Sequence, residues 1–332
     1  MKTLLSYAKM FNKNFDIKKK QEHKMYDVPK NTFENEVVLE SKYISQGCDF
    51  GSLLSNHRVS LVRSPMGSGK TWGARAILEG DHRICYVSCK RAFCSAIHTQ
   101  IQPYGFVNYL DFEKGDKREI GKAKKILISI ESLYSCADQY DFIFFDECET
   151  LFTNITGEMN VKNNAMGSLM KLTQILKNGK LVLRDAYLGK RTIDFTNEFM
   201  KTNNIKPAEV VFINNLFVNE ERTYRECKDI SINGTRFTKK QVFKSAIMKS
   251  IREGKKIAVC SGSRTLLEEV ELEILKYDNE LKYIFYNKKN PLPLGTNVNV
   301  AWDDIKVLMY SPTITAGISY DERDDHTPFD EL

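Results

Sequence analysis

The sequence has few of the residues that mark secreted, fibrous or membrane proteins. Its 332 residues include two tryptophans and eight prolines, and its eight cysteines form no Cys-x-x-Cys pair. No stretch reaches the roughly 18 consecutive apolar residues that a membrane helix needs. The N-terminal segment has only a short apolar run and no small-residue cleavage site, so it does not resemble a signal peptide. We therefore expect an intracellular protein with reduced thiols, neither secreted nor inserted in a membrane.

Neither sign of charge dominates the chain. There are 49 basic and 43 acidic residues, a net charge of +6, and the composition of 42% hydrophobic and 28% charged residues is ordinary for a globular protein. The mild basic excess is compatible with a polyanionic partner but does not require one. The length is enough for about two domains.

One short window holds several residue types that ligate metals. No spacing within it matches a zinc finger or ribbon, and Cys85 lies in an apolar run that reads as a buried strand. Buried free cysteine is common in protein cores. We therefore interpret the window as core rather than as a metal site; its members are His82, Cys85, Cys89, Cys94 and His98.

From about residue 45 onward, short apolar runs alternate with helical patterns. This alternation predicts an α/β fold with a largely parallel sheet. Helices are expected to begin near Lys70, Arg91 and Asn163. The predicted strands are 59–63, 84–88, 106–110, 125–129, 142–146, 180–184 and 210–214.

A second series of elements follows residue 220. It contains helical patterns at 242–251 and 266–274 and apolar runs at 256–260, 283–286 and 305–310. These supply about three strands, fewer than the usual five or six of a sheet. We expect an N-terminal extension over residues 1–40, a first α/β unit over 41–220 and a smaller, partial unit over 221–332.

A phosphate-binding loop is the most specific feature of the sequence. Residues 64–71 fit the pattern GxxxxGK[ST], except that Ser64 stands in place of the first glycine. A predicted strand precedes the loop and a predicted helix follows it, which makes a chance Gly-Lys turn the weaker interpretation. The residues expected to bind ATP (or another nucleoside triphosphate) are Ser64, Pro65, Met66, Gly67, Ser68, Gly69, Lys70 and Thr71.

The chemistry of the loop assigns a role to its central residues. Gly67 and Gly69 allow the backbone to curl, so that successive N–H groups and the start of the next helix face phosphate oxygens. Lys70 would reach the β- and γ-phosphates, and the hydroxyl of Thr71 would ligate Mg²⁺. ATP and Mg²⁺ are therefore the expected ligands.

An acidic motif follows the loop by about 75 residues. The predicted strand 142–146 ends in Asp146 and Glu147, at the end of the strand where open α/β sheets bind ligands. Asp146 would hold Mg²⁺ through water, and Glu147 would orient or deprotonate the attacking water. The alternative is an acidic pair that simply begins a helix. We predict Lys70, Asp146 and Glu147 as the catalytic residues.

A third strand, 180–184, also ends beside a carboxylate. Asp185 is a candidate sensor of the γ-phosphate. A turn-forming aspartate at the end of a strand is an equally good interpretation.

Taken in order, these segments resemble the motifs of superfamily 2 helicases. The loop at 64–71 looks like motif I, 85–94 like motif Ia, 127–133 like motif Ib and 146–149 like motif II. The segments at 181–188, 256–265 and 307–321 are similar to motifs III, IV and V.

Within that superfamily, the chain resembles the herpesvirus-type replication origin-binding proteins. Four strings carry this resemblance: Met66 within the loop, Ser-Cys-Lys-Arg from Ser88, Ile-Glu-Ser-Leu from Ile130, and Ser-Pro-Thr-Ile-Thr-Ala-Gly-Ile-Ser from Ser311. The similarity runs from about residue 40 to the end of the sequence.

The resemblance implies two RecA-like lobes, an ATP-binding lobe over 41–220 and an incomplete one over 221–332, that use ATP to move along DNA. Single-stranded DNA is the expected partner, other replication proteins are candidates, and a membrane partner is not expected. The residues that the resemblance assigns to the DNA backbone are Arg91, Ser132, Ser263 and Thr315. For each of them, a helix cap or a solvated loop position is an equally good interpretation.

Two departures from the family pattern leave alternatives open. Motif VI, whose arginine reaches the γ-phosphate, is not found in this sequence, and no separate origin-binding domain follows motif V. The leading hypothesis is an ATP-dependent DNA helicase or translocase. The alternative is a truncated module that binds ATP and DNA without productive turnover. A P-loop kinase of small molecules fits less well, because it has no need of a second α/β unit.

Overall fold

The computed structural model describes residues 28–29, 32–88, 91–112, 117–155, 165–218, 227–232, 234–293, 296, 298–311 and 329. The chain divides into two compact units, Met1–Asn219 and Glu220–Leu332. This division falls beside the boundary expected at residue 220. Each unit is described below by itself.

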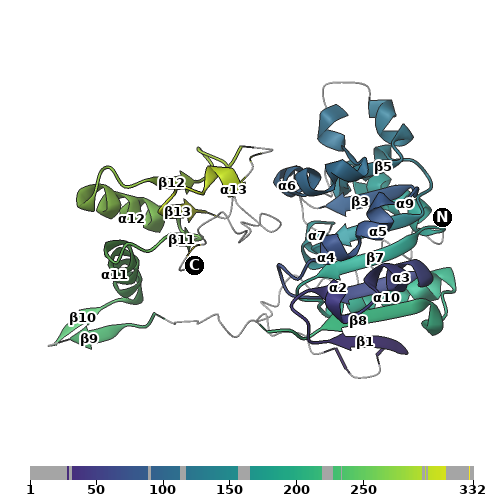
Figure 1. The fold of residues 1–332 in the computed structure, drawn as a ribbon, viewed down its shortest axis with the longest axis horizontal. Coiled ribbons are helices and arrows are strands. Elements are labelled where there is room, and N and C mark those ends of the chain that lie inside the picture. Colours follow the sequence, from purple (N-terminus) through teal and green to yellow (C-terminus); the bar gives the residue numbers. More distant parts are fainter. Residues whose placement is uncertain are drawn as a thin grey trace. The chain divides into compact units, whose positions relative to one another are not determined.

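The first unit is built on an eight-stranded sheet in the order β1-β8-β2-β7-β6-β3-β5-β4, in which every paired strand is parallel (Figure 1). All five residues of β2, β3 and β6 are buried. Strands buried on both faces read as continuous apolar runs, which is why the sequence shows them so clearly. The strands are β1 Asn35–Leu39, β2 Val59–Arg63, β3 Ile84–Ser88, β4 Val107–Asn108, β5 Lys125–Ser129, β6 Phe142–Asp146, β7 Lys180–Asp185 and β8 Val210–Asn215.

Helices connect these parallel strands. The α-helices are α2 Ile44–Gly47, α3 Phe50–Asn56, α4 Lys70–Gly73, α5 Arg75–Glu79, α6 Arg91–Ile101, α7 Cys148–Ile155, α9 Ala165–Leu176 and α10 Lys190–Asn203. Short 3₁₀-helices are η1 Gln102–Tyr104, η2 Tyr109–Phe112, η3 Lys117–Lys122, η4 Ile130–Ser135 and η5 Pro207–Glu209. One large apolar core runs through the unit and includes the fully buried Phe144, Phe152 and Phe199.

Three local differences separate this unit from the sequence prediction. Strand β1 pairs with β8 in parallel, so residues 35–39 belong to the sheet and not to the extension expected over 1–40. Its alternating burial is that of an edge strand, whose signal in the sequence is weaker than that of a central strand. The strand expected at 106–110 is reduced to the two residues of β4. The helix expected from Lys70 is interrupted at Ala74, which separates α4 from α5.

The second unit has a three-stranded parallel sheet in the order β11-β13-β12 and a separate antiparallel hairpin, β9–β10. The hairpin was not predicted from the sequence. The elements are β9 Ile230–Ile232, β10 Thr235–Phe237, α11 Lys239–Arg252, β11 Ile257–Cys260, α12 Arg264–Tyr277, β12 Tyr283–Tyr286, α13 Val298–Ala301 and β13 Val307–Tyr310.

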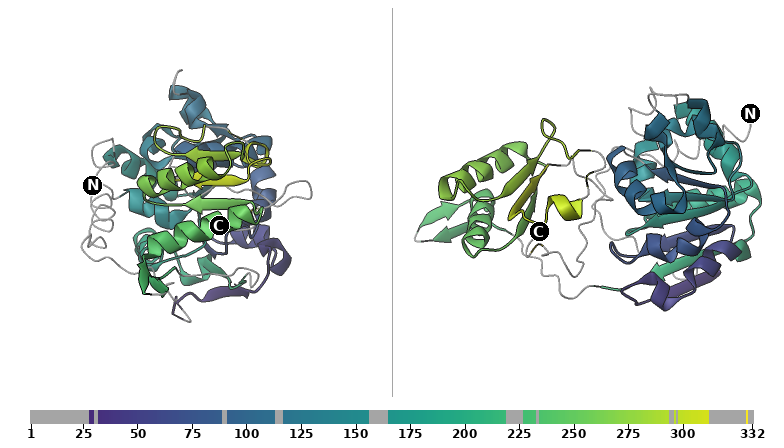
Figure 2. Two further views of the ribbon diagram at one scale, coloured as in Figure 1. Left: turned by 90° about the vertical axis from the view of Figure 1, so that its left-hand side faces the viewer. Right: turned by 45° about the horizontal axis from the view of Figure 1, so that its top comes forward.

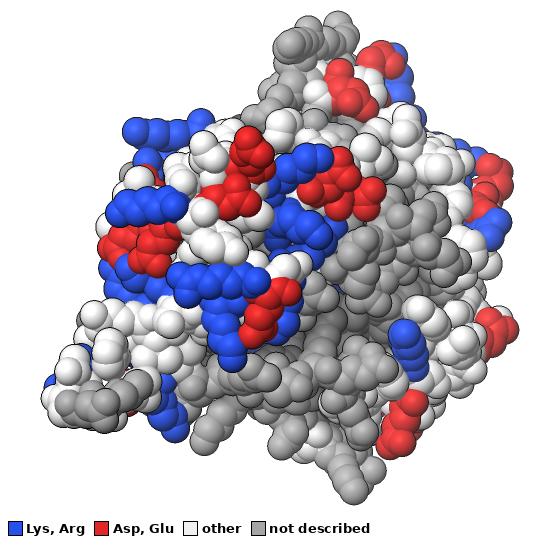
Figure 3. Space-filling model, turned by 60° about the vertical axis from the view of Figure 1, so that its left-hand side comes forward, with Lys and Arg blue, Asp and Glu red and all other residues white. Residues whose placement is uncertain are grey.

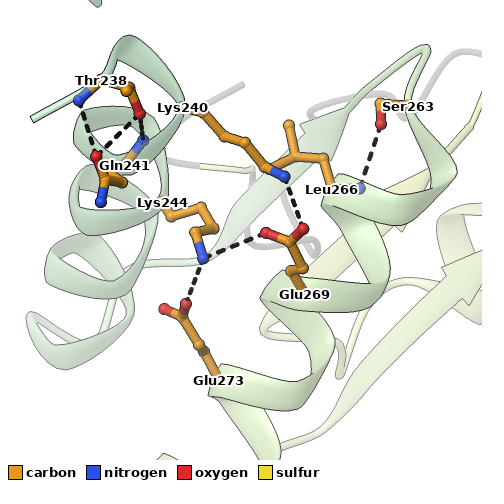
Figure 4. A network of polar contacts seen from close by, with 8 residues as sticks. All are labelled: Thr238, Lys240, Gln241, Lys244, Ser263, Leu266, Glu269 and Glu273. Carbon is orange, nitrogen blue, oxygen red and sulfur yellow. Dashed lines mark hydrogen bonds and ion pairs between the residues drawn. The ribbon is translucent and has the colours of Figure 1, made fainter. Parts of the chain in front are cut away.

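Helices α11 and α12 lie side by side in this unit (Figure 2). Ile247 and Ile251 of α11 and Leu267 and Val270 of α12 are buried in one apolar cluster. Ion pairs between the two helices join Lys240 and Lys244 to Glu269 and Lys244 to Glu273 (Figure 4). On the face of the molecule drawn in Figure 3, basic and acidic side chains lie next to one another.

Among the residues that the structure describes, no helix combines the length and the apolar character that crossing a membrane requires.

Candidate nucleotide-binding site

The predicted phosphate-binding loop joins the end of β2 to the start of α4. Gly67 and Gly69 have φ angles of 73° and 71°, in the left-handed region that glycine adopts without steric cost. An added Cβ on Gly67 would meet nothing within 4 Å, so the backbone angle rather than lack of space requires a glycine there. The loop therefore has the tight curl that turns backbone N–H groups toward an anion.

Ser64 occupies the position of the missing first glycine and is completely buried. Its hydroxyl donates to Ser68 Oγ at 2.6 Å and accepts from Asn215 Nδ2 at 3.1 Å. Its backbone N–H donates to the carbonyl of Asp185 at 3.1 Å. A serine is accommodated here because its polar atoms have partners on the ends of β7 and β8, which anchor the loop to the sheet.

Lys70 is the first residue of α4, and its side chain folds back over the loop. Its Nζ donates to the carbonyl oxygens of Ser64 at 2.8 Å and Pro65 at 3.0 Å. Burial lowers the pKa of Lys70, while the nearby carboxylates of Asp146 and Glu147 act in the opposite direction. The ammonium thus lies inside the loop and interacts electrostatically with the carboxylates that follow β6 and end β7.

Asp146 ends β6 and is 6% exposed. Its Oδ2 accepts a hydrogen bond from the hydroxyl of Tyr86 at 2.6 Å and forms an ion pair with Nη2 of Arg184 at 3.1 Å. Within the described part of the chain, Oδ1 makes no hydrogen bond or ion pair. One carboxylate oxygen of Asp146 is therefore held by Tyr86 and Arg184, and the other has no partner among the described residues.

Glu147 follows Asp146 and has φ 52°, a conformation that costs a non-glycine residue energy. Burial raises the pKa of Glu147 to about 7, and the negative charges of Asp185 and Asp146 act in the same direction. A carboxylate that exchanges its proton near neutral pH is suited to act as a general base.

Asp185, at the end of β7, accepts two backbone hydrogen bonds. Its Oδ2 accepts from the N–H of Glu149 at 2.9 Å and its Oδ1 from the N–H of Tyr187 at 3.1 Å. Burial raises its pKa to about 6, although these hydrogen bonds oppose the shift. The bond to Tyr187 is the strand-end turn that we weighed as an alternative, and the bond to Glu149 ties β7 to the acidic motif.

Glu149, the last acid of the motif, has a structural position. Its Oε1 accepts hydrogen bonds from the N–H groups of Gly189 at 2.8 Å and Thr192 at 3.3 Å. These are N–H groups at the start of α10, which a carboxylate satisfies well. Glu149 therefore links α7 to α10, because its Oε1 is held by N–H groups at the start of α10.

Arg184, like Tyr86, is a residue of this site that was not predicted from the sequence. It lies one position before Asp185 on β7, beside Asp146 in the strand register, and is completely buried. Nη1 donates to the backbone carbonyl of Lys70 at 3.1 Å, and Nη2 donates to the hydroxyl of Tyr86. The available signal was an arginine inside an otherwise apolar strand, because arginine is almost never fully buried unless it is paired.

The two side chains that we predict to hold Mg²⁺ are Thr71, in α4, and Asp146, at the end of β6, and both carry oxygen donors of the kind that this ion binds. No group of three or more His, Cys, Asp or Glu suited to a metal occurs in the described part of the chain. Mg²⁺ is usually held by one or two carboxylates together with substrate phosphates and water, so this donor set fits it.

The window of His and Cys residues forms no metal cluster among its described members. Cys85 and Cys94 are buried thiols, and His82 packs edge-on against the ring of Phe142. His98 makes a hydrogen bond with the carbonyl of Phe106 through Nε2 at 3.1 Å. Cys89 lies outside the described residues.

The residues expected to touch DNA belong to other elements than the loop and the acidic strand end, or lie outside the described residues. Arg91 begins α6, and its side chain is not described. Ser132 is half-buried in η4, and its Oγ accepts from Ser129 Oγ at 3.4 Å. Ser263 caps α12, with Oγ accepting from the N–H of Leu266 at 3.3 Å (Figure 4). Thr315 lies outside the described residues.

The fold is that of the RecA-like lobes of superfamily 2 helicases. It is similar to the DUF1998 helicase MrfA bound to DNA and AMPPNP, with a TM-score of 0.60, 13% identity and coverage of 84% of this chain and 43% of that chain. It is also similar to Mss116p bound to single-stranded RNA and AMP-PNP, with a TM-score of 0.56, 16% identity and coverage of 84% and 62%.

The chain belongs to the family of origin of replication binding proteins, whose family model matches residues 30–330. It is 26% identical over 291 residues to the "Putative replication origin-binding protein" of Acanthamoeba polyphaga mimivirus, covering 81% of this chain and 34% of that protein. It is 24% identical over 296 residues to the replication origin-binding protein of Varicella-zoster virus (strain Dumas), covering 82% and 34%. The chain thus spans about a third of the length of these relatives. The resemblance inferred from the motifs is confirmed at the level of family and fold.

Proposed function

We propose that this chain is the motor part of an ATP-dependent DNA helicase or translocase of the replication origin-binding type. One observation carries the proposal. The adjacent strands β2, β7 and β6 end together, and their ends hold Lys70, Asp185, Asp146 and Glu147 within mutual electrostatic reach. That combination of a cationic loop and neighbouring carboxylates suits the binding and hydrolysis of a nucleoside triphosphate.

Each residue has a task in the proposed reaction. The loop's N–H groups and Lys70 bind the phosphates of ATP and offset the charge that develops on them. Bound Mg²⁺, held by Thr71 and Asp146, would neutralise phosphate charge. Glu147 orients the attacking water and accepts its proton, because its pKa of about 7 leaves it partly ionised at neutral pH.

DNA is the proposed nucleic acid. The named relatives are replication origin-binding proteins, and the solved neighbour MrfA was determined with DNA. Arg91, Ser132, Ser263 and Thr315 remain our predicted contacts to the DNA backbone, where hydroxyl and guanidinium groups bind phosphates without reading sequence. An intracellular site of action fits the seven free thiols that the described residues contain.

The test is ATP hydrolysis by the purified chain with and without single-stranded DNA. We expect hydrolysis that DNA stimulates and that Lys70→Ala and Glu147→Gln each reduce at least ~100-fold. Lys244→Ala is the matched control for charge removal, because its ammonium lies in an ion-pair network of the second unit.

Two outcomes would revise the proposal. Hydrolysis that no nucleic acid changes would contradict a DNA motor. Tight ATP binding with hydrolysis at background would favour the alternative, a module that binds ATP and DNA without turnover.

A further inference from the structure

A buried cluster behind the proposed site connects its two catalytic segments. The guanidinium of Arg184 lies 5.2 Å from the ring centres of both Tyr86 and Phe144, and these two rings stack on each other at 5.7 Å. The aromatic rings and the sheet bury Arg184 completely. A buried cation is costly unless its N–H donors are hydrogen-bonded or paired with an opposite charge.

The partners of Arg184 belong to both segments of the site. One terminal nitrogen donates to the carbonyl of Lys70, the first residue of the loop's helix. The other contacts Asp146 Oδ2 and the hydroxyl of Tyr86. Its Nε has no hydrogen-bond partner within the described residues. The side chain therefore spans from the phosphate-binding loop to the acidic strand end.

The contacts on Asp146 are one-sided. Tyr86 donates to Oδ2 at 2.6 Å, and Arg184 pairs with the same oxygen at 3.1 Å. The terminal torsion of an aspartate is broad and soft, so an unrestrained carboxylate would rotate. Two donors on Oδ2 fix that rotation and keep Oδ1 directed away from them.

We propose that Arg184 and Tyr86 are positioning residues that lock Oδ2 of Asp146 and thereby present Oδ1 to the Mg²⁺ of the bound nucleotide. This inference rests on the proposed function, since it assumes that Asp146 serves that ion. The physical basis is general: partners of a metal-binding carboxylate orient it, and removing them typically lowers metal affinity 10- to 100-fold.

Two substitutions distinguish an effect of the orientation of the Asp146 carboxylate from an effect of the nearby positive charge. Tyr86→Phe removes the hydroxyl that donates to Asp146 and accepts from Arg184, but it removes no charge and keeps the ring that stacks on Phe144. Arg184→Lys keeps the cation but loses the planar fork that reaches Lys70 and Asp146 together. Tyr140→Phe is the matched control, because its buried hydroxyl accepts from the N–H of Ala137 at 3.3 Å and makes no contact with Asp146.

The measurement is binding of a fluorescent ATP analogue to the full chain, titrated with Mg²⁺ and repeated in EDTA, so that no turnover is needed. Thermal melting without nucleotide first identifies the variants that fold. For Tyr86→Phe and Arg184→Lys we expect the Mg²⁺ midpoint to rise about 10-fold, with affinity in EDTA within about 2-fold of wild type. Tyr140→Phe should leave both unchanged.

Three results would contradict the inference in whole or in part. If wild type requires Mg²⁺ and a folded Tyr86→Phe keeps the wild-type midpoint, the positioning role is wrong and the proposed function stands. If Arg184→Lys alone keeps the wild-type midpoint, Arg184 supplies only charge and its part in the inference is wrong. If wild type binds the analogue equally with Mg²⁺ and in EDTA, the inference and the proposed magnesium site are both wrong.

Discussion

The two units each contain a network of charged side chains, and the networks differ in burial. In the first unit, Arg184 pairs with Asp146 with side-chain exposures of 0% and 9%. In the second, Lys240 and Lys244 pair with Glu269 and Glu273 at exposures between 20% and 48% (Figure 4). The buried pair cannot exchange its partners for water, whereas the exposed pairs can. We therefore expect the buried network to fix the geometry of its site, and the more exposed network to contribute little to the stability of its two helices.

The largest expected effect follows from breaking the buried network. Arg184→Met removes the cation and leaves Asp146 beside Tyr86 without its ion pair. Breaking a buried pair by removing one partner costs about 3–5 kcal/mol, because the other charge stays buried. We expect a loss of that size in the free energy of unfolding of the first unit, measured by denaturant titration.

A double variant sharpens this prediction. Adding Asp146→Asn to Arg184→Met removes the stranded charge, so part of the lost stability should return. A single-variant loss below about 1 kcal/mol would mean that the pair is not strongly coupled to folding.

A smaller effect is expected from Glu147, and it depends on pH. Burial raises the pKa of Glu147 from its ordinary value of 4.5 to about 7. Its protonated form therefore favours the folded state, and that contribution to stability is lost as pH rises from about 4.5 through about 7. The side chain in the Glu147→Gln variant cannot ionise, so the variant should keep this contribution to stability as the pH rises. We expect the variant to be more stable than wild type at pH 8 by on the order of 1–3 kcal/mol, with the difference vanishing near pH 4.5.

Thermal melting of both proteins across this pH range in the absence of nucleotide measures the difference. Equal melting curves at pH 8 would contradict a raised pKa. Glu149→Gln should not reproduce the effect, because that side chain is satisfied by N–H donors at the start of α10.

The smallest effect belongs to the exposed network. Lys244 is hydrogen-bonded to Glu273 at 2.8 Å and pairs with Glu269 at 3.3 Å, and the side chains of these two glutamates are 38% and 35% exposed. Lys244→Ala should lower the stability of the second unit by less than ~1 kcal/mol, and by less still at 1 M salt. If Lys244→Ala lowered the free energy of unfolding as much as Arg184→Met does, the expected difference in stability contribution between the two networks would be wrong.

The central sheet was well predicted because of its burial. Strands β3, β5 and β6 coincide with the residues expected for them, since each is a short, buried apolar run. Edge strand β1 was missed, because it alternates in burial and pairs with β8, which lies far along the chain. Such long-range pairing leaves no local signal.

The candidate site was predicted in part. The loop and the two acids after β6 follow a spacing pattern, and the structure brings them to one edge of the sheet. Arg184 and Tyr86 follow no pattern, because their role depends on contacts between β7, β3 and β6 that the sequence does not reveal. Asp185 could be placed at a strand end but not assigned its N–H partners.

The most direct test of the central claim, that these strand ends form an Mg²⁺–ATP site, is equilibrium binding of ATP in the presence of Mg²⁺ by wild type, Lys70→Ala and Lys244→Ala. We predict that wild type and Lys244→Ala bind alike, and that Lys70→Ala binds at least ~10-fold more weakly, because Lys70 faces the loop and Lys244 does not. Equal binding by a folded Lys70→Ala, or no binding by wild type, would contradict the account.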